Sequence, residues 1–403
     1  MSLTYDNISI LISRYYQKLN STNLNFIRYL YKRINWQARI IGIKGARGVG
    51  KSTLLIQRIK MFHKNPEEAI YISLDDMWFS SHSLEDLVEF LYARGIKYFY
   101  IDEVHRYPMW NRVIKNLYDF YSDINIVYTG SALLAIDNAV ADLSRRQSLY
   151  TLWGMSFREY LEYESIISIS PISLPELLSG HVALSMQLSN SISILKHFED
   201  YLDHGYYPFY KENPQDFSMR LAEVVKIVIE NDIPVTEEIS FSTVTKLKTL
   251  MMVIAENAPL EPNISKLAER LECSRDLCVK MLGLLDRSRL IQQMFKHPRT
   301  YKQMRGADKI LGGDTNILHA LTGTVNIGTS RETFFVNQLQ AIGEVIIADH
   351  GDYIIDGKYT FEIGGSGKKF SQIADIPDSY LAVDNIVTGF GARIPLYLFG
   401  MLY

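Results

Sequence analysis

The residues with the clearest chemical meaning form one glycine-rich segment. It reads Gly45-Ala46-Arg47-Gly48-Val49-Gly50-Lys51-Ser52-Thr53 and fits the pattern G-x-x-x-x-G-K-[ST] in full. Its glycines let backbone N–H groups point inward, and the following helix start adds positive potential, so together they make a nest for phosphates. Lys51 is expected to reach the β- and γ-phosphates, and the Ser52 hydroxyl to ligate Mg²⁺. The segment therefore predicts ATP as ligand and Mg²⁺ as cofactor.

Two acids stand where a phosphate loop needs a carboxylate on the metal side. Asp102 and Glu103 directly follow the apolar run Tyr98-Phe-Tyr-Ile101. Asp102 is predicted to hold the Mg²⁺ shell, and Glu103 to activate the attacking water. Two acidic residues after a strand usually lie in a solvent-exposed turn. The phosphate loop upstream instead favours a role for them in binding Mg²⁺ and activating water.

Hydroxyl groups end the next apolar run, 124–128. Thr129 or Ser131 could sense the γ-phosphate or orient the water from this position. Alternatively Ser131 caps a helix, because Ala-Leu-Leu-Ala follows it.

Paired arginines, Arg145 and Arg146, precede the strand expected at 148–152. Such pairs are usually solvated at a surface. An arginine that stabilises charge on the transferring phosphoryl group is the alternative. It would act in trans and imply a homo-oligomer.

The elements that must position these residues alternate along the chain. Short apolar runs predict strands at 39–43, 69–72, 98–101, 124–128 and 148–152, with helical stretches between them. Strands buried on both faces and separated by helices indicate a parallel α/β sheet. A Ser-, Ile- and Pro-rich stretch at 165–175 predicts a domain boundary, and a mostly helical region follows to 255.

Composition excludes several classes of protein. The 403 residues carry 42 Lys+Arg against 45 Asp+Glu, a net charge of −3, so neither a basic nucleic-acid coat nor an acidic disordered chain is expected. The length predicts two or three domains. Cys273 and Cys278 are too few for a disulfide framework, which favours a reducing compartment, and zinc is not expected. Neither a signal peptide nor a long apolar run is visible, so we expect a cytoplasmic protein with no membrane contact.

Together these motifs resemble the prokaryotic AAA+ ATPases that join an ATPase core to a C-terminal domain of unknown function. The resemblance rests on the phosphate loop and on further motifs along the chain: Tyr100-Ile-Asp-Glu103, Tyr128-Thr-Gly-Ser131, Ser156-Phe-Arg-Glu-Tyr-Leu161, Gly205-Tyr-Tyr-Pro208, the helical pair at 262–291 and Pro395-Leu-Tyr-Leu-Phe-Gly400. It implies ATP binding and hydrolysis, with the Asp102 strand next but one to the phosphate-loop strand or close by. Arg146 matches the family's arginine, although Arg145 replaces the glycine that precedes it there.

A basic helical pair follows in the C-terminal half. Residues 262–271 and 276–285 read as helix-turn-helix, and residues 263–310 hold eleven Lys/Arg against five Asp/Glu. Such a winged-helix unit could dock DNA with residues near Arg275 and Lys280 facing the groove. The alternative is a protein-interaction or structural module.

The last segment resembles the PD-(D/E)xK nuclease core. Glu332, Asp352 and Glu362 match its metal-binding acids, but Gly364 replaces its lysine, and Lys368 or Lys369 would have to substitute. Residues 331–403 carry five Lys/Arg against nine Asp/Glu, which disfavours a grip on phosphates. We expect an inactive scaffold.

The predicted organisation is a P-loop α/β core with accessory domains. The expected segments are an N-terminal helical segment at 1–35, the ATPase core at 36–165, a helical lid at 166–255, a winged helix at 256–312 and a nuclease-like α+β domain at 313–403. The predicted function is an Mg²⁺-dependent, ATP-hydrolysing switch. An ATP-gated DNA-binding regulator or defence-type factor is the alternative, and a metal-dependent nuclease is a third possibility.

Overall fold

A computed structural model describes residues 3–133, 136–137, 143–296 and 306–403. The chain divides into two compact units, Met1–Gly154 (unit 1) and Met155–Tyr403 (unit 2). Each unit is described by itself.

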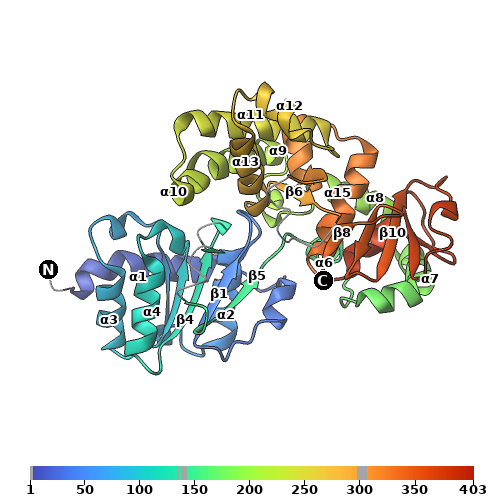
Figure 1. Ribbon diagram of the computed structural model, residues 1–403. Coiled ribbons are helices and arrows are strands. Elements are labelled where there is room, and N and C mark those ends of the chain that lie inside the picture. Colours follow the sequence, from blue (N-terminus) through green and yellow to red (C-terminus); the bar gives the residue numbers. More distant parts are fainter. Residues whose placement is uncertain (1–2, 134–135, 138–142, 297–305) are drawn as a thin grey trace. The chain divides into compact units, whose positions relative to one another are not determined.

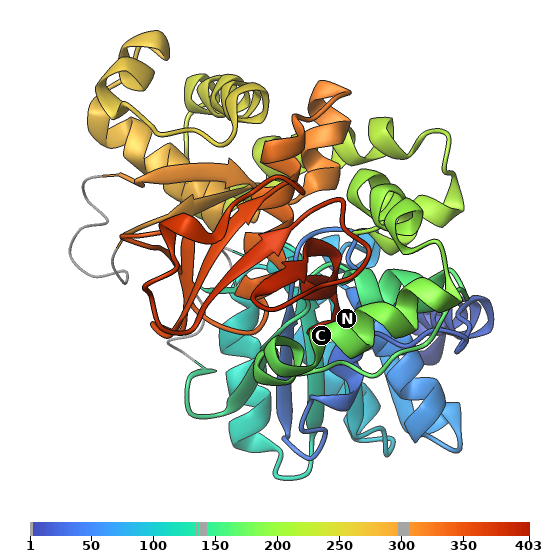
Figure 2. The same cartoon turned by 90° about the vertical axis from the view of Figure 1, so that its right-hand side faces the viewer.

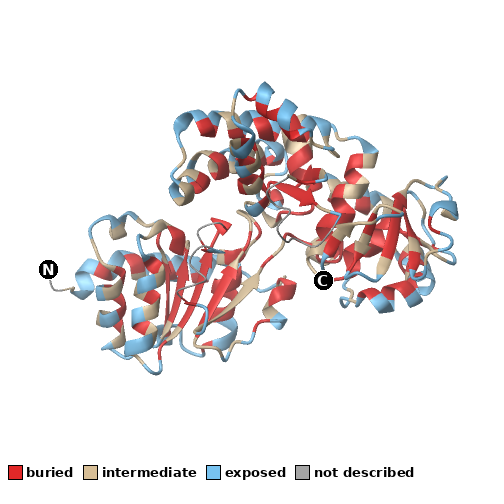
Figure 3. Ribbon diagram, viewed as in Figure 1, coloured by how far each residue is buried: buried red, intermediate tan, exposed pale blue. Residues whose placement is uncertain are grey.

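Unit 1 is built on a five-stranded parallel sheet (Figure 1). Its strands are β1 (Ile40–Lys44), β2 (Ala69–Ser73), β3 (Tyr98–Asp102), β4 (Asn125–Gly130) and β5 (Gln147–Thr151). They lie in the order β2-β3-β4-β1-β5, so β3 is next but one to β1, as expected. The three central strands are almost wholly buried (Figure 3), which explains their continuous apolar runs. The predicted α/β P-loop architecture of this part is confirmed.

Helices cover both faces of this sheet. They are α1 (Tyr5–Ser21), α2 (Lys51–Phe62), α3 (Leu84–Tyr92) and α4 (Trp110–Phe120). On one face Tyr128 of β4 packs against Trp110 of α4. Tyr128 pairs with Ile101 of β3, so these two side chains share a face. Successive residues of a strand point to opposite faces, and Tyr100 and Asp102 therefore lie on the other face. There, His63 at the end of α2 contacts Tyr100. Helix α1 packs on the edge strand β2.

The N-terminal segment differs from the prediction. The helix covers Tyr5–Ser21, capped by Thr4 and Asn7, whereas 27–34 forms only a 3₁₀ turn at Tyr29–Lys32. Tyr29, Leu30 and Ile34 are buried in this segment without forming an α-helix.

The predicted boundary at 165/166 also differs from the division at Gly154. Residues 156–163 belong to unit 2 because α6 (Phe157–Tyr163) packs against the C-terminal 3₁₀ segment Leu396–Met401. The Ser156 hydroxyl and the Arg158 guanidinium both donate to the main-chain oxygen of Tyr403, at 2.6 and 2.8 Å. The segments predicted at 166–255, 256–312 and 313–403 do not separate into units of their own.

Helices make up much of unit 2. They are α6, α7 (Leu174–Ser191), α8 (Ile194–His204), α9 (Phe217–Ile227), α10 (Ile233–Glu237), α11 (Phe241–Asn257), α12 (Ile264–Arg270), α13 (Arg275–Arg287), α14 (Thr315–Thr322) and α15 (Ile327–Gln340). Capping residues mark several starts, among them Ser156 and Ser173 with their glutamates three residues on. The expected pair at 262–271 and 276–285 is present as α12 and α13.

Two sheets complete unit 2. Strands β6 (Ile291–Met294) and β7 (Lys309–Gly312) form an antiparallel pair after α13. The larger sheet has the order β12-β11-β10-β9-β8 and appears in red in Figure 2. Its strands are β8 (Val345–Ile347), β9 (Tyr353–Ile355), β10 (Tyr359–Gly364), β11 (Ser379–Val383) and β12 (Arg393–Pro395). In the described part of the chain, no helix is long and apolar enough to cross a membrane.

Candidate functional site

The glycine-rich loop lies at the carboxyl end of β1 and leads directly into α2. Gly45 has no room for a side chain, because a Cβ there would lie 2.3 Å from the main-chain oxygen of Leu152. Gly50 caps α2 with a φ of 95°, a left-handed conformation that favours glycine. Of the nine predicted loop residues, Gly45, Val49 and Lys51 are buried and Thr53 is exposed. These constraints hold the loop in the strand–loop–helix shape that binds phosphates.

Lys51 is held by the loop itself. Its ammonium donates to the carbonyl oxygens of Gly45 and Ala46, both at 2.9 Å. From unit 1's N-terminal segment, the buried Arg28 donates to the carbonyls of Val49 and Trp153, the latter at 2.7 Å. Arg28 thus joins the loop to the strand end beyond β5. No motif in the sequence singles out this arginine.

Both carboxylate oxygens of Asp102 accept a hydroxyl. The phenol of Tyr71, on β2, donates to Oδ2 at 2.7 Å, and the Thr129 hydroxyl donates to Oδ1. Thr129 also accepts the N–H of Glu103 at 3.4 Å. The register of β2 and β3 pairs Ser73 with Asp102, so Tyr71 reaches the carboxylate diagonally across one face. Thr129 therefore supports the two acids.

Glu103 is turned toward the end of β4. Its backbone is left-handed, with a φ of 52°. Its Oε2 accepts the Ser131 hydroxyl at 2.8 Å and the Ser131 N–H at 3.3 Å. The same oxygen lies 3.2 Å from Nδ1 of His105, whose side chain is only 2% exposed. A non-glycine residue in this conformation is uncommon and is retained only where its surroundings hold it.

Charge around Glu103 favours its ionised form. Burial alone would raise the pKa of Glu103, but the Lys51 ammonium and the Ser131 hydrogen bonds outweigh it, and the pKa is lowered. Burial lowers the pKa of His105 to about 4, against the pull of Glu103. His105 is therefore neutral near pH 7, and its contact with Glu103 is not an ion pair. Burial, with the charge of Asp102, raises the pKa of Tyr71, so its phenol remains a donor.

A cavity of about 590 Å³ opens beside these groups. Ser52, Tyr71, Asp102 and Glu103 line one part of it, and side chains of α1 line another. Ser52 and Asp102 offer a hydroxyl and a carboxylate, hard oxygen donors of the kind that Mg²⁺ takes together with substrate phosphates. The residues present thus fit Mg²⁺.

Arg146 lies away from this group. It precedes β5, whose first residue Gln147 pairs with Ile40 at the amino end of β1. This end lies about 13 Å along the strand from the carboxyl end of β1, after which the phosphate loop begins. Its Nε and Nη2 donate to Asp119 at 2.8 and 3.0 Å. The structure therefore does not bring Arg146 to the phosphate loop of its own chain. Arg145 is exposed.

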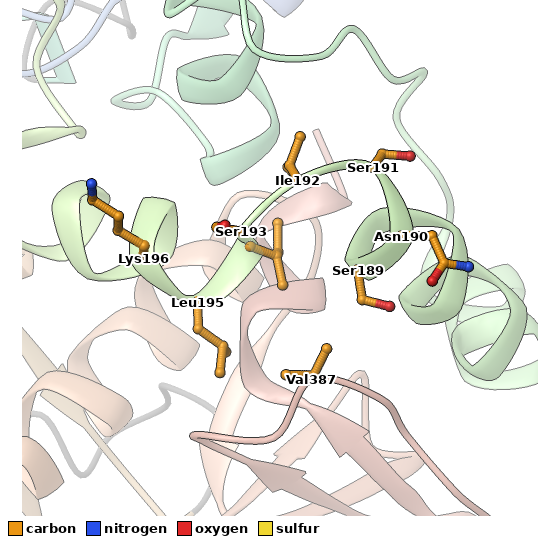
Figure 4. Close-up of a pocket in the computed structure, with 9 residues that line it drawn as sticks. Ser189, Asn190, Ser191, Ile192, Ser193, Leu195, Lys196 and Val387 are labelled. Atoms are coloured by element: carbon orange, nitrogen blue, oxygen red, sulfur yellow. The ribbon is translucent and has the colours of Figure 1, made fainter.

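A second hollow, of about 530 Å³, lies in unit 2 where α7 meets α8 (Figure 4). Serines and aliphatic side chains line it, with Val387 on the opposite wall and Lys196 as its single charged residue. Such a lining offers little for catalysis.

The nuclease-like acids of unit 2 are each bound to other groups. Glu332 accepts from Lys309 at 2.9 Å and from Tyr353 at 2.7 Å. Lys368 lies 2.6 Å from Glu362. Asp352 accepts the N–H of Ile363 at 2.7 Å. Among the described residues, no three His, Cys, Asp or Glu side chains are placed to hold a metal ion.

Cations of the helix-turn-helix segment face an acid on α10. Lys280 and Arg287 of α13 lie 3.5 and 3.3 Å from Glu237. Three further cations of the basic segment, Arg299, Lys302 and Arg305, lie outside the described residues.

Two further residues of the unit 1 site were missed by sequence reasoning. Tyr71 stands in an apolar strand, where a tyrosine is expected to be part of the hydrophobic core. His105 could have been noticed, because it stands two residues after Glu103 in a predicted loop.

Comparison with protein families supports this description. Residues 37–161 match a family described as an AAA domain, and residues 195–327 match a domain of unknown function (DUF8612). With the phosphate loop and the sheet order, the first match identifies a nucleotide-binding, ATPase-like domain of the AAA type.

Two similar curated proteins come from Methanocaldococcus jannaschii. The uncharacterized protein MJ1637 is 25% identical over 326 residues, which cover 75% of this chain and 66% of that protein. The uncharacterized protein MJ1544 is 28% identical over 128 residues, 30% of this chain and 28% of that protein. The chain thus spans just under two thirds of the first relative and much less of the second.

Two solved structures show more distant likeness. The Walker-type ATPase PABY2304 of Pyrococcus abyssi has a TM-score of 0.41 at 12% identity, covering 79% of this chain and 95% of that one. AMPPCP-bound DnaA from Aquifex aeolicus has a TM-score of 0.25 at 14% identity, covering 70% and 89%. Both scores are below 0.5, so neither likeness indicates what this chain binds or does.

Proposed function

We propose that this chain hydrolyses ATP with Mg²⁺ and uses the reaction as a molecular switch. The observation that carries the proposal is the gathering of Lys51, Ser52, Asp102 and Glu103 at one edge of the sheet, with the last three lining one cavity. A protein that only binds the nucleotide, without hydrolysing it, needs the phosphate loop but no such glutamate. The glutamate beside the metal-side aspartate supports hydrolysis.

Each residue has a defined role in the proposed reaction. The loop N–H groups and Lys51 bind the β- and γ-phosphates, and Ser52 and Asp102 would hold Mg²⁺. When bound, Mg²⁺ neutralises charge on the phosphate oxygens. Glu103 takes a proton from water as the water oxygen bonds to the γ-phosphorus and the bond to the bridging oxygen breaks, leaving ADP and phosphate.

The test pairs each site variant with an exposed control of the same type. Lys51→Ala should weaken ATP binding, whereas Lys64→Ala should leave it unchanged. Glu103→Gln should bind ATP but lower turnover by about 10²- to 10⁴-fold, the range of a lost general base, whereas Glu67→Gln should hydrolyse normally. Wild-type protein that neither binds nor hydrolyses ATP would exclude the function.

Arg146 is proposed to complete the site in trans. Its position at the opposite edge of its own sheet agrees with action on a neighbouring copy. Arg146→Ala should then lower turnover, and wild-type protein should restore part of the activity in mixed assemblies. Light scattering that finds only monomers in the presence of ATP would exclude this role.

DNA binding through residues 263–310 is the second candidate function. It is supported by the order α12, α13, β6, β7, which is that of a winged helix, and by the local excess of cations. Glu237 offsets part of that charge at Lys280 and Arg287. Affinity for duplex DNA that falls steeply with salt and depends on ATP would support an ATP-gated regulator, and no salt-dependent binding would reject it. We do not propose nuclease activity, since lysines already pair with Glu332 and Glu362.

A further inference from the structure

Tyr71 lines the same cavity as Ser52 and Asp102, the two proposed ligands of Mg²⁺. It belongs to β2 and is 7% exposed. Its phenol donates to Oδ2 of Asp102 at 2.7 Å. No other part of the proposed reaction uses this side chain.

Two hydroxyls fix the Asp102 carboxylate from opposite oxygens. Thr129 holds Oδ1 from β4, and Tyr71 holds Oδ2 from β2, on either side of β3. A carboxylate held at both oxygens cannot rotate about its Cβ–Cγ bond without breaking a buried hydrogen bond. The orientation of the carboxylate is therefore set before any ligand arrives.

We infer that Tyr71 is a positioning residue that orients Asp102 for a divalent cation bound with the nucleotide. The inference rests on the proposed function, in which Ser52 and Asp102 hold Mg²⁺. Groups that orient metal ligands through hydrogen bonds typically change metal affinity or activity by 10- to 100-fold when removed. Tyr71 is expected to act on the metal and not on the nucleotide.

Tyr100 provides a matched control. It pairs with Tyr71 in the β2–β3 register and faces the same side of the sheet. It is also buried, but its phenol contacts His63 at 3.1 Å and not a carboxylate. Tyr71→Phe and Tyr100→Phe therefore each remove one buried oxygen from neighbouring rings, and only the first touches Asp102.

The experiment measures metal affinity directly in the full chain. Mn²⁺ binding is followed by electron paramagnetic resonance in the presence of a non-hydrolysable ATP analogue, and analogue binding is measured separately in EDTA. Tyr71→Phe should weaken Mn²⁺ binding about 10- to 100-fold and raise the Mg²⁺ concentration for half-maximal hydrolysis by a similar factor. Tyr100→Phe should change neither, and both variants should bind the analogue in EDTA like wild type.

A double-mutant cycle with Asp102→Asn tests the route of the effect. The double variant should lose no more Mn²⁺ affinity than Asp102→Asn alone, because Tyr71 acts through that carboxylate. Unchanged Mn²⁺ affinity in Tyr71→Phe, equal losses in both tyrosine variants, or additive losses in the cycle would overturn the inference. No analogue binding by wild type, either in EDTA or with Mg²⁺ or Mn²⁺ present, would instead mean that the proposed function itself fails.

Discussion

A buried carboxylate in unit 2 predicts an unusual pH dependence of stability. Asp314 caps α14, its Oδ1 accepts the Ile317 N–H and its Oδ2 accepts the Tyr207 phenol, both at 2.8 Å. The residue is 3% exposed. Burial raises its pKa from 3.8 to about 6, and these hydrogen bonds only partly oppose the rise. The folded state therefore binds a proton to Asp314 more tightly than the unfolded state does.

The direction and the magnitude of the pH effect on stability follow from this difference in pKa between the folded and unfolded states. Because the folded pKa lies above the unfolded one, the contribution of Asp314 to stability is full below about pH 3.8 and is lost as pH rises through about 6. On acidification from pH 7 to pH 5, protonation of Asp314 adds about 1.3 kcal/mol to the free energy of unfolding. Its total contribution at low pH is about 3 kcal/mol.

The assay compares wild type with Asp314→Asn at pH 5, 6, 7 and 8. Asparagine keeps the capping oxygen but cannot ionise. Urea unfolding is followed by far-ultraviolet circular dichroism, which reports the helices of both units. Tryptophan fluorescence identifies the unit 1 transition, because all four tryptophans, Trp36, Trp78, Trp110 and Trp153, lie in unit 1, and the remaining change in the dichroism is assigned to unit 2. The exposed Asp349→Asn serves as control. Taking the difference between variant and wild type removes the titration of other groups.

The expected result is a wild-type-minus-variant difference that grows by about 1.3 kcal/mol from pH 7 to pH 5. The control should show no such change. A difference that stays constant with pH, or that shrinks on acidification, would refute the reasoning about Asp314.

Three further predictions concern the site and the core. Ser131→Ala removes a hydroxyl that hydrogen-bonds the Glu103 carboxylate, so it should raise the pKa of Glu103 and move the acidic limb of the ATPase pH profile to higher pH. An acidic limb at the wild-type pH would contradict this role of Ser131. Gly45→Ala should abolish binding of a fluorescent ATP analogue, since its Cβ would meet the Leu152 carbonyl, and normal binding would show that the loop can shift. Phe157→Ala should cost about 3–5 kcal/mol in the urea unfolding of unit 2, because Phe157 is fully buried among aromatic rings, and a loss below about 1 kcal/mol would contradict that packing.

Local patterns predicted the strands of unit 1 well. The five runs expected at 39–43, 69–72, 98–101, 124–128 and 148–152 match β1 to β5 to within one or two residues. Parallel strands buried on both faces leave continuous apolar runs, and such runs can be read without knowledge of the fold.

The helical segment predicted at 1–35 is present only in its first part, as α1. Ile8, Leu11, Tyr15 and Leu19 are the buried residues of α1 and carry a readable helical spacing. Residues 27–34 form only a 3₁₀ turn, although Tyr29, Leu30 and Ile34 are buried there and Arg28 donates to the Val49 carbonyl of the phosphate loop. Burial of an irregular segment can imitate helical periodicity.

The sequence by itself determined the phosphate loop and the acids after β3. Both depend on short contiguous segments whose residue types have few other uses. Only the tertiary structure decided that Tyr71 and Thr129 hold Asp102, that Ser131 and His105 face Glu103, and that Arg146 lies at the opposite edge of the sheet. These contacts join separate strands, so they follow from strand order and register. Neither is encoded within any one segment.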